Sequence, residues 1–240
     1  PDNIGPVVLS VAPSDSVTIK IAFNEAIDKT IPPADQFIIE PSRDIIGVRF
    51  DDPSLASISL SIASPLYAGE TYTITIGELF DCSGNILQEQ SKSSQFVIPQ
   101  KAEAGDVIIN EILFNPTPHG VDFVEVFNRS EKVIDLRNWS LGNPHREVDK
   151  TATLSETLSI IYPGEYRVFT DDVDVLKGEY IAGHESTFRQ TDLPSFNDDE
   201  GQVVLWTDRG QTIDSIYYSK DYHSPFVSDG EGISLERICR

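Results

Sequence analysis

The chain contains no methionine and only two cysteines among its 240 residues. It begins at Pro1, and we expect it to be a trimmed piece of a longer product, so the lack of a signal peptide is uninformative. Two cysteines are too few for the disulfide framework that staples small secreted domains. We expect Cys82 and Cys239 to be unpaired, because a disulfide would need their Cα atoms within about 7 Å across two different regions.

Basic residues are also scarce. There are 18 Lys and Arg against 39 Asp and Glu, which gives a formal net charge of −21. The acidic surplus is spread along the chain, with 5 basic and 13 acidic residues in the first 100 and 13 and 26 in the rest. A nucleic-acid surface needs clustered Lys and Arg, so the composition argues against a nucleic-acid partner.

Long apolar runs are absent as well. No stretch of about 18 apolar residues exists, so the sequence predicts no membrane insertion. The contents of 39% hydrophobic and 24% charged residues are typical of a folded, soluble protein. The length suffices for one large all-β domain or two ordinary ones.

The dominant pattern along the chain is alternation with a period of two residues. Such segments, rich in β-branched and aromatic residues and separated by turn residues, predict short strands of the kind found in sandwiches and barrels. The segments are 16–23, 57–63, 71–76, 94–99, 203–206 and 212–218. The best helix signal is "TDDVDVLKGEY", where Thr170 or Asp171 could cap one or two turns.

A polar stretch, "PQKAEAGD" at 99–106, separates two strand-rich regions. We therefore predict two domains, 1–102 and 103–240. In the second, "YPGEY" and "TDRGQT" predict turns between strands.

Two glutamates occupy positions where a strand would normally carry an apolar residue. In "DFVEVFN", Glu125 shares a face with Phe123 and Phe127, and in "GDVIINEILF" regular alternation places Glu111 with Val107, Ile109 and Leu113. A pair of carboxyl groups could serve as acid and base in an open cleft. The alternative is a structural role, in which each carboxylate is held by hydrogen bonds or an ion pair. We favour this structural role and expect Arg237 to be the partner of Glu125, because a guanidinium offers a planar, two-pronged donor.

The second half resembles the lamin tail domain, an immunoglobulin-like β-sandwich. An ordered set of motifs spanning about 130 residues carries the resemblance: "INEILFNP", "DFVEVFNRS" with "IDLRNWSL", "YPGEYRVF", "DEGQVVLWTDRGQTIDSIYYS" and "EGISLER". The family's reported association with nucleic acid is opposed here by the acidic charge. Lamin tail units usually continue past the "SLER" strand, so the resemblance implies a domain truncated at its C-terminal end.

The first half resembles a bacterial immunoglobulin-like domain of the S-layer protein type, through "VTIKIAFNEAID", "LYAGETYTITIGELFDCSGNIL" and "SQFVI". Together the two resemblances imply two immunoglobulin-like sandwiches in tandem, as in exported surface proteins of Bacteroidetes-like bacteria. The expected location is therefore extracellular or at the bacterial cell surface.

Familiar catalytic patterns are missing. The sequence has no GxSxG, HExxH, P-loop or GxGxxG motif, so we predict no catalytic, cofactor or metal-catalytic residues. The histidines stand singly, without metal-ligand spacing: His119, His145, His184 and His223. Calcium remains a possible ligand, because oxygen-rich loops occur at Asp171, Asp172 and Asp174, at Asn197, Asp198, Asp199 and Glu200, and at Asp81 and Asn85. None of these loops fits an EF-hand, and we favour the alternative that these acids are solvated or cap turns.

For ligand binding, the aromatic stretch "IYYSKDYHSPF" is the candidate. Tyr217 and Tyr218 are adjacent in a strand and must face opposite ways. The candidate contact residues are Tyr218, Tyr222, His223 and Phe226. The competing interpretation is that Tyr222 and Phe226 fold back over the end of the sandwich. We assign Trp139 and Trp206 to the core.

The function predicted from the sequence is that of a non-catalytic scaffold, adhesion and recognition segment of a larger surface protein. Its partners would be a surface protein or glycan, together with other domains of the same longer chain. The alternative is a pair of accessory domains in an extracellular nuclease, phosphatase or glycan hydrolase whose catalytic domain lies elsewhere.

Overall fold

The computed structural model describes residues 2–144, 151–180, 187–227 and 230–238. The chain divides into two compact units, Pro1–Ile98 and Pro99–Arg240. The division falls after residue 98 rather than after residue 102. Ala102 already belongs to the core of the second unit, and the backbone N–H of Gln100 donates to the carbonyl of Val133 at 2.7 Å.

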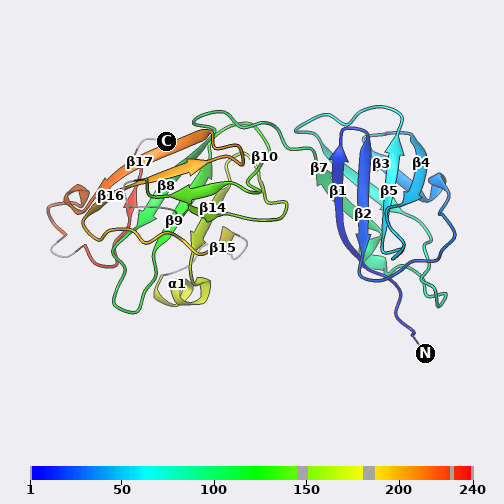
Figure 1. Cartoon of the computed structure of the whole chain (residues 1–240), viewed down its shortest axis with the longest axis horizontal. Coiled ribbons are helices and arrows are strands. Elements are labelled where there is room, and N and C mark those ends of the chain that lie inside the picture. The colour runs from blue at the N-terminus through cyan, green and yellow to red at the C-terminus, as the bar shows by residue number, and fades with distance from the viewer. Residues whose placement is uncertain (1, 145–150, 181–186, 228–229, 239–240) are drawn as a thin grey trace. The chain divides into compact units, whose positions relative to one another are not determined.

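The first unit consists of two antiparallel sheets, with strand orders β1-β2-β5-β4 and β3-β6-β7 (Figure 1). The elements are β1 (Val8–Asp15), β2 (Thr18–Phe23), the 3₁₀ helix η1 (Ala34–Gln36), β3 (Phe37–Glu40), β4 (Ile45–Phe50), β5 (Ser57–Ile62), β6 (Thr71–Ile76), η2 (Glu89–Ser91) and β7 (Ser93–Val97). Alternate residues of both sheets, such as Ile19 and Ile21 in β2 and Ile74 and Ile76 in β6, meet in one core. This unit is therefore a β-sandwich.

The second unit contains a four-stranded sheet, β12-β11-β16-β17, a five-stranded sheet, β15-β14-β9-β8-β18, and the small pair β10-β13. Its strands are β8 (Val107–Leu113), β9 (Phe123–Asn128), β10 (Ile134–Asp135), β11 (Ser140–Gly142), β12 (Thr151–Thr153), β13 (Ile160–Ile161), β14 (Tyr166–Thr170), β15 (Phe188–Gln190), β16 (Glu200–Trp206), β17 (Thr212–Ser219) and β18 (Leu235–Glu236). Residues from both larger sheets form its core, among them Val124, Leu205 and Tyr218. The predicted all-β class with tandem sandwiches is confirmed.

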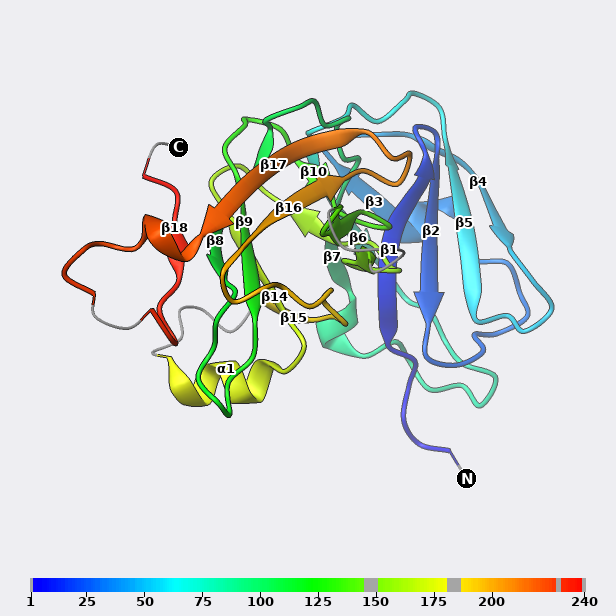
Figure 2. The same cartoon turned by 60° about the vertical axis from the view of Figure 1, so that its left-hand side comes forward.

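The predicted helix is α1 (Val173–Glu179), capped by Asp172 rather than by Thr170 or Asp171. The Asp172 carboxylate accepts hydrogen bonds from the backbone N–H groups of Asp174 and Val175. As Figure 2 shows, α1 lies near the ends of β9 and β14. Leu176 packs there in a small second cluster with Leu113 and Phe123, outside the main core.

Asn128, in the motif "FNRS", is fully buried at the end of β9. Its Nδ2 donates to the carbonyls of Lys132 and Ile161 at 2.8 and 3.1 Å, and its Oδ1 accepts from the backbone and hydroxyl of Ser130. All its polar capacity is used within the fold, which accounts for a polar residue at the heart of this motif.

The tryptophans occupy different environments. Trp139 is buried in the core as predicted. Trp206 is only half-buried and packs over Gly142, where an added Cβ would lie 2.6 Å from the indole ring. The assignment of Trp206 to the core is therefore wrong. It follows Leu205, which takes the inward position, and a register shift falls between the two.

Candidate functional site

The two glutamates lie directly opposite each other on β8 and β9. Glu125 shares its face with Phe123, as predicted, while Val124 and Val126 point into the core. For Glu111 the predicted register is wrong, because a β-bulge lies between Ile109 and Glu111. The extra residue reverses the alternation, so Ile109 and Ile112 both face the core and Glu111 stands on the outer face.

Each of these carboxylates is half-buried and already engaged. Glu111 accepts a hydrogen bond from the hydroxyl of Ser234, and Glu125 accepts one from Nδ2 of Asn110 at 2.9 Å. Their neighbour across β18 is a third acid, Glu236. The arrangement is a row of carboxylates across an outer sheet face, with hydrogen bonds that hold the bulged strand in place.

Arg237 does not pair with Glu125, so that prediction is wrong. Its guanidinium forms an ion pair with Asp214 of β17 at 2.6 Å, and its Nε donates to the carbonyl of Ile109 at 3.0 Å. The physical reason is alternation along the last strand: Glu236 shares the face of Glu111 and Glu125, so Arg237 turns to the other side.

The Arg237–Asp214 ion pair lies beside β8 and forms hydrogen bonds with the backbone of that strand. Oδ2 of Asp214 accepts the backbone N–H of Ile109 at 2.7 Å, and the backbone N–H of Arg237 donates to the carbonyl of Asn110 at 2.7 Å. Backbone groups that a longer neighbouring strand would satisfy are thus held by an ion pair that bridges the two sheets.

The aromatic candidates divide into buried and exposed side chains. Tyr218 is only 1% exposed and packs against Phe114, so its side chain belongs to the core and not to the exposed aromatic surface. Its hydroxyl accepts a hydrogen bond from the backbone N–H of Asn197. Tyr222 is 60% and Phe226 98% exposed, so neither is folded over the end of the sandwich. His223 is half-buried, with its ring 6.0 Å from that of Phe114.

The exposed member of the pair Tyr217 and Tyr218 is Tyr217, which was not among the contact residues predicted from the sequence. It is 50% exposed, and its ring meets that of Tyr222 edge to face, with 6.4 Å between centroids. Alternation along β17 required one of the two tyrosines to face outward, but only the packing of Tyr218 against the core decides which.

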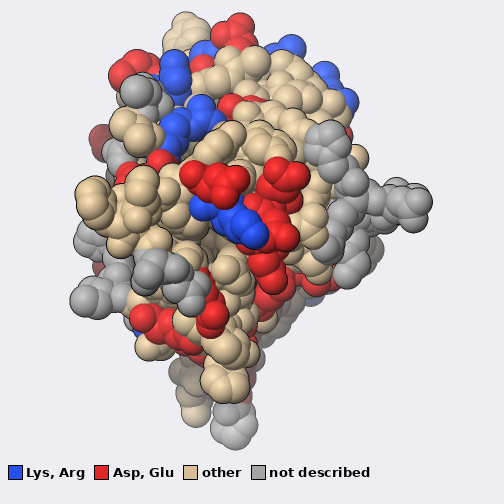
Figure 3. All heavy atoms as spheres, turned by 90° about the vertical axis from the view of Figure 1, so that its left-hand side faces the viewer, with Lys and Arg blue, Asp and Glu red and all other residues tan. Residues whose placement is uncertain are grey.

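Tyr217 and Tyr222 line a groove of about 360 Å³ beside β17. Its other walls include apolar, polar and charged residues: Ile109, Asn110, Ile112, Ile216, Tyr218, Leu235, Glu236, Arg237 and Ile238. Next to it, acidic residues gather around Lys220, which pairs with Asp199 at 2.6 Å. Figure 3 shows acidic side chains crowding around a few basic ones on this side of the second unit.

The carboxylate of Glu200 connects these two surfaces. It accepts a hydrogen bond from the hydroxyl of Tyr217. That hydrogen bond, together with desolvation and the negative charge of Glu200, raises the pKa of Tyr217 to about 12, so the phenol stays protonated.

The calcium candidates are engaged in the fold in three different ways. In the loop at 171–174, Asp172 caps α1 and Asp171 accepts the backbone N–H of Leu193 at 2.6 Å. In the loop at 197–200, Asp199 and Glu200 hold Lys220 and Tyr217. In both loops, some of the carboxylates are therefore already engaged by groups of the protein.

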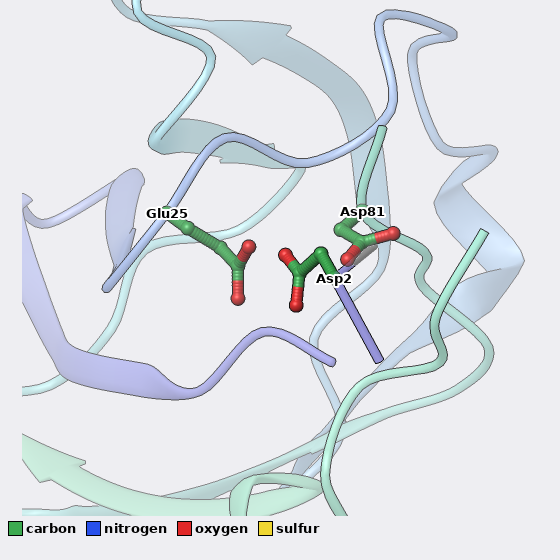
Figure 4. A group of neighbouring side chains, drawn as sticks. All are labelled: Asp2, Glu25 and Asp81. Carbon is green, nitrogen blue, oxygen red and sulfur yellow. The ribbon is translucent and has the colours of Figure 1, made fainter. Parts of the chain in front are cut away.

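The third loop, around Asp81, belongs to a larger cluster. Figure 4 shows the carboxylates of Asp2, Glu25 and Asp81 turned toward one another, and their closest oxygens all lie within 4.8 Å. Asp81 is buried and accepts hydrogen bonds from the backbone of Ser83 and from the backbone and Nδ2 of Asn85, which lower its pKa despite burial.

A family model described as Lamin Tail Domain matches residues 100–220, just over half of the chain. The chain belongs to the lamin tail domain family. A second model, described as Bacterial Ig-like domain, matches residues 2–97, nearly the whole first unit. Both predicted resemblances are therefore confirmed. The lamin tail match ends at residue 220, so Tyr222 and Arg237 lie beyond it.

No curated protein matches the sequence. Among solved structures, the N-terminal part of the bacterial S-layer protein SbsC is 14% identical with a TM-score of 0.37; the alignment covers 90% of this chain and 44% of that one. A structure of native alpha-2-macroglobulin from Escherichia coli that spans domains MG0-NIE-MG1 is 12% identical with a TM-score of 0.30, over 96% of this chain and 90% of that one. L,D-transpeptidase 3 from Mycobacterium tuberculosis is 12% identical with a TM-score of 0.24, over 50% and 44%. Similarity at this level says nothing about activity.

One acid near the lamin tail domain's helix escaped the sequence patterns. Asp122 has a buried Oδ1 with no hydrogen-bond partner among the described residues, and its Oδ2 accepts only a long bond, 3.5 Å, from the backbone of Phe196. Burial raises its pKa to about 6, and the charges of Asp171 and Asp198 add to the shift.

Three sequence candidates, His145, His184 and Cys239, lie outside the described residues. Cys82 is an exposed free thiol. In the part of the chain that is described, no helix is long and apolar enough to cross a membrane.

Proposed function

We propose that this chain is a non-catalytic scaffold and recognition segment of a larger, exported bacterial surface protein. The observation that carries the proposal is that each half has its own hydrophobic core built from two sheets, which is the construction of a spacer module. The bacterial Ig-like match in the first unit supports a surface location.

The absence of catalysis is part of the proposal. The pair suggested by the sequence, Glu111 and Glu125, stands on an outer sheet face, and Ser234 and Asn110 hold the two carboxylates. Neither glutamate lines the groove beside β17. A structural role for both acids is consistent with these contacts.

Surface exposure can be tested on intact cells of a bacterium that produces the parent protein. We expect added protease to remove the segment from intact cells, as detected with an antibody raised against residues 1–240, while a cytoplasmic marker stays whole. Protection of the segment until the cells are lysed would contradict a surface location.

Scaffold and accessory roles can be separated by the full reading frame. Further immunoglobulin-like or lamin tail repeats favour a scaffold, whereas a neighbouring hydrolase domain favours the accessory role. An array of glycans and peptides, probed with and without calcium, then tests whether the segment recognises a ligand at all.

A further inference from the structure

The groove beside β17 has aromatic walls and adjoins a cleft lined by acidic side chains. Tyr217 and Tyr222 are both half or more exposed and stand edge to face, with centroids 6.4 Å apart. Ile216 and Leu235 form the apolar floor where the two sheets of the second unit meet. Exposed aromatic rings arranged in a fixed pair are a common anchor for a protruding side chain.

The charges at this surface are unbalanced. The groove and the adjoining acidic cleft are lined by five carboxylates, Asp198, Asp199, Glu200, Asp221 and Glu236, and by two basic side chains, Lys220 and Arg237. Both basic side chains already have carboxylate partners, Asp199 for Lys220 and Asp214 for Arg237. A partner that lies in the groove and reaches the adjoining cleft therefore meets a surplus of negative charge.

From this geometry we infer that the groove binds an extended, Arg- or Lys-containing peptide of another protein. The apolar stem of the basic side chain would lie across the rings of Tyr217 and Tyr222, and its charge would face Glu200 and Asp221. β17 is an edge strand of its sheet, so an extended chain can run beside it. The inference rests on the recognition role proposed above and specifies its partner by charge complementarity.

The test uses the whole 240-residue chain and three fluorescent octapeptides, with alternating Gly and Arg, Gly and Gln, or Gly and Glu. We expect the Arg peptide to bind with a Kd of about 10–100 μM in anisotropy titrations, the range of a small exposed site. The Gln peptide should bind at least about tenfold more weakly and the Glu peptide not measurably.

A chain with a net charge of −21 attracts any cation, so the decisive variants leave the charge unchanged. Tyr222→Ala and Tyr217→Ala should each weaken the Arg peptide about fivefold or more. Tyr67→Ala is the matched control, because Tyr67 is 66% exposed but lies in the first unit. Circular dichroism verifies that each variant is folded.

One further variant tests the contribution of the negative charge. Glu200→Gln keeps an acceptor for the Tyr217 hydroxyl while removing one charge, and we expect it to weaken the Arg peptide about two- to threefold at 50 mM salt.

Equal binding of the Arg peptide by the wild type, Tyr217→Ala and Tyr222→Ala would overturn the inference, because it would indicate diffuse attraction to the acidic surface. A neutral oligosaccharide that binds more tightly than the Arg peptide and is lost in Tyr222→Ala would overturn it in favour of a glycan. Neither result bears on surface exposure, which the protease experiment tests separately.

Discussion

Each of the two units contains an aspartate with a buried carboxylate oxygen, and the pKa values of these two aspartates shift in opposite directions. Asp81 in the first unit is 2% exposed, yet hydrogen bonds from Ser83 and Asn85 in its own turn lower its pKa. Asp122 in the second unit is less buried, but its Oδ1 has no hydrogen-bond partner within the described part of the chain, and its pKa rises to about 6. The supply of donors, more than the depth of burial, decides which charge state the fold favours.

The donors differ because of where they come from. The partners of Asp81 lie within four residues of it in the sequence, in a turn where Gly84 adopts a φ of 86°. Among the described residues, the hydrogen bond to the Asp122 carboxylate comes from the backbone N–H of Phe196, 74 residues away. A local turn can be built around its acid, whereas a distant loop reaches Asp122 only as the tertiary packing allows.

The largest expected effect is on the first unit. Asp81→Ala removes the acceptor of three hydrogen bonds and leaves their donors unsatisfied, so we expect the melting temperature of this unit to fall by roughly 5–10 °C. Both tryptophans belong to the second unit, so the transition of the first unit is the one seen by calorimetry and not by tryptophan fluorescence.

The matched control is the exposed Asp44→Ala, which should leave both transitions unchanged. The lowered pKa of Asp81 also implies that its stabilisation is present above the ordinary pKa of an aspartate and is lost as the pH falls through the lowered folded value. A first-unit transition unaffected by Asp81→Ala at pH 7 would break the comparison.

A smaller effect of opposite sign is expected in the second unit. A pKa of about 6 against an ordinary 3.8 means that ionised Asp122 costs stability at pH 7. Partial exposure reduces this cost to about 1–2 kcal/mol, so Asp122→Asn should raise the free energy of unfolding at pH 7 by that amount. Urea unfolding followed by tryptophan fluorescence measures it.

The pH dependence has a defined sign. The folded state of the wild type binds more protons than the unfolded state between about pH 4 and 6, so the contribution of Asp122 improves as the pH falls. The advantage of Asp122→Asn should therefore vanish near pH 4, while exposed Asp208→Asn should give no such trend. An advantage that persists at pH 4 would assign it to new contacts of the amide.

The smallest effect tests an acid between these extremes. Glu111 is half-buried on an outer face and is held by Ser234, and a glutamine can accept the same hydrogen bond. We expect Glu111→Gln to change the free energy of unfolding by no more than about 0.5 kcal/mol. A loss above 2 kcal/mol in the same urea titration would show that the charge itself stabilises the sheet.

Much of the fold could be read from side-chain alternation. The predicted segments at 57–63 and 71–76 became β5 and β6, and the glycines of the two predicted turns, Gly164 and Gly210, adopt positive φ. Strands such as β4, where Gly47 interrupts the pattern at a register shift, gave no clear period.

The candidate site was less accessible to prediction. The sequence indicated Tyr217 and Tyr222 only as members of an aromatic stretch. Alternation along the strand could not decide whether Tyr217 or Tyr218 faces outward. One bulged residue reversed the face of Glu111, and the partner of Arg237 proved to lie on a different sheet. No sequence pattern indicated Asp122, because Phe196, which donates to its carboxylate, and its charged neighbours Asp171 and Asp198 are distant in sequence.

By itself, the sequence determined the all-β class, the two modules and the acidic charge, because alternation, turn chemistry and composition are local or additive properties. Only the tertiary structure decided which tyrosine is exposed, what Arg237 binds and how many hydrogen bonds each acid accepts. These depend on side chains brought together from segments as far apart as Ile109 and Arg237, and no periodicity within a strand carries that information.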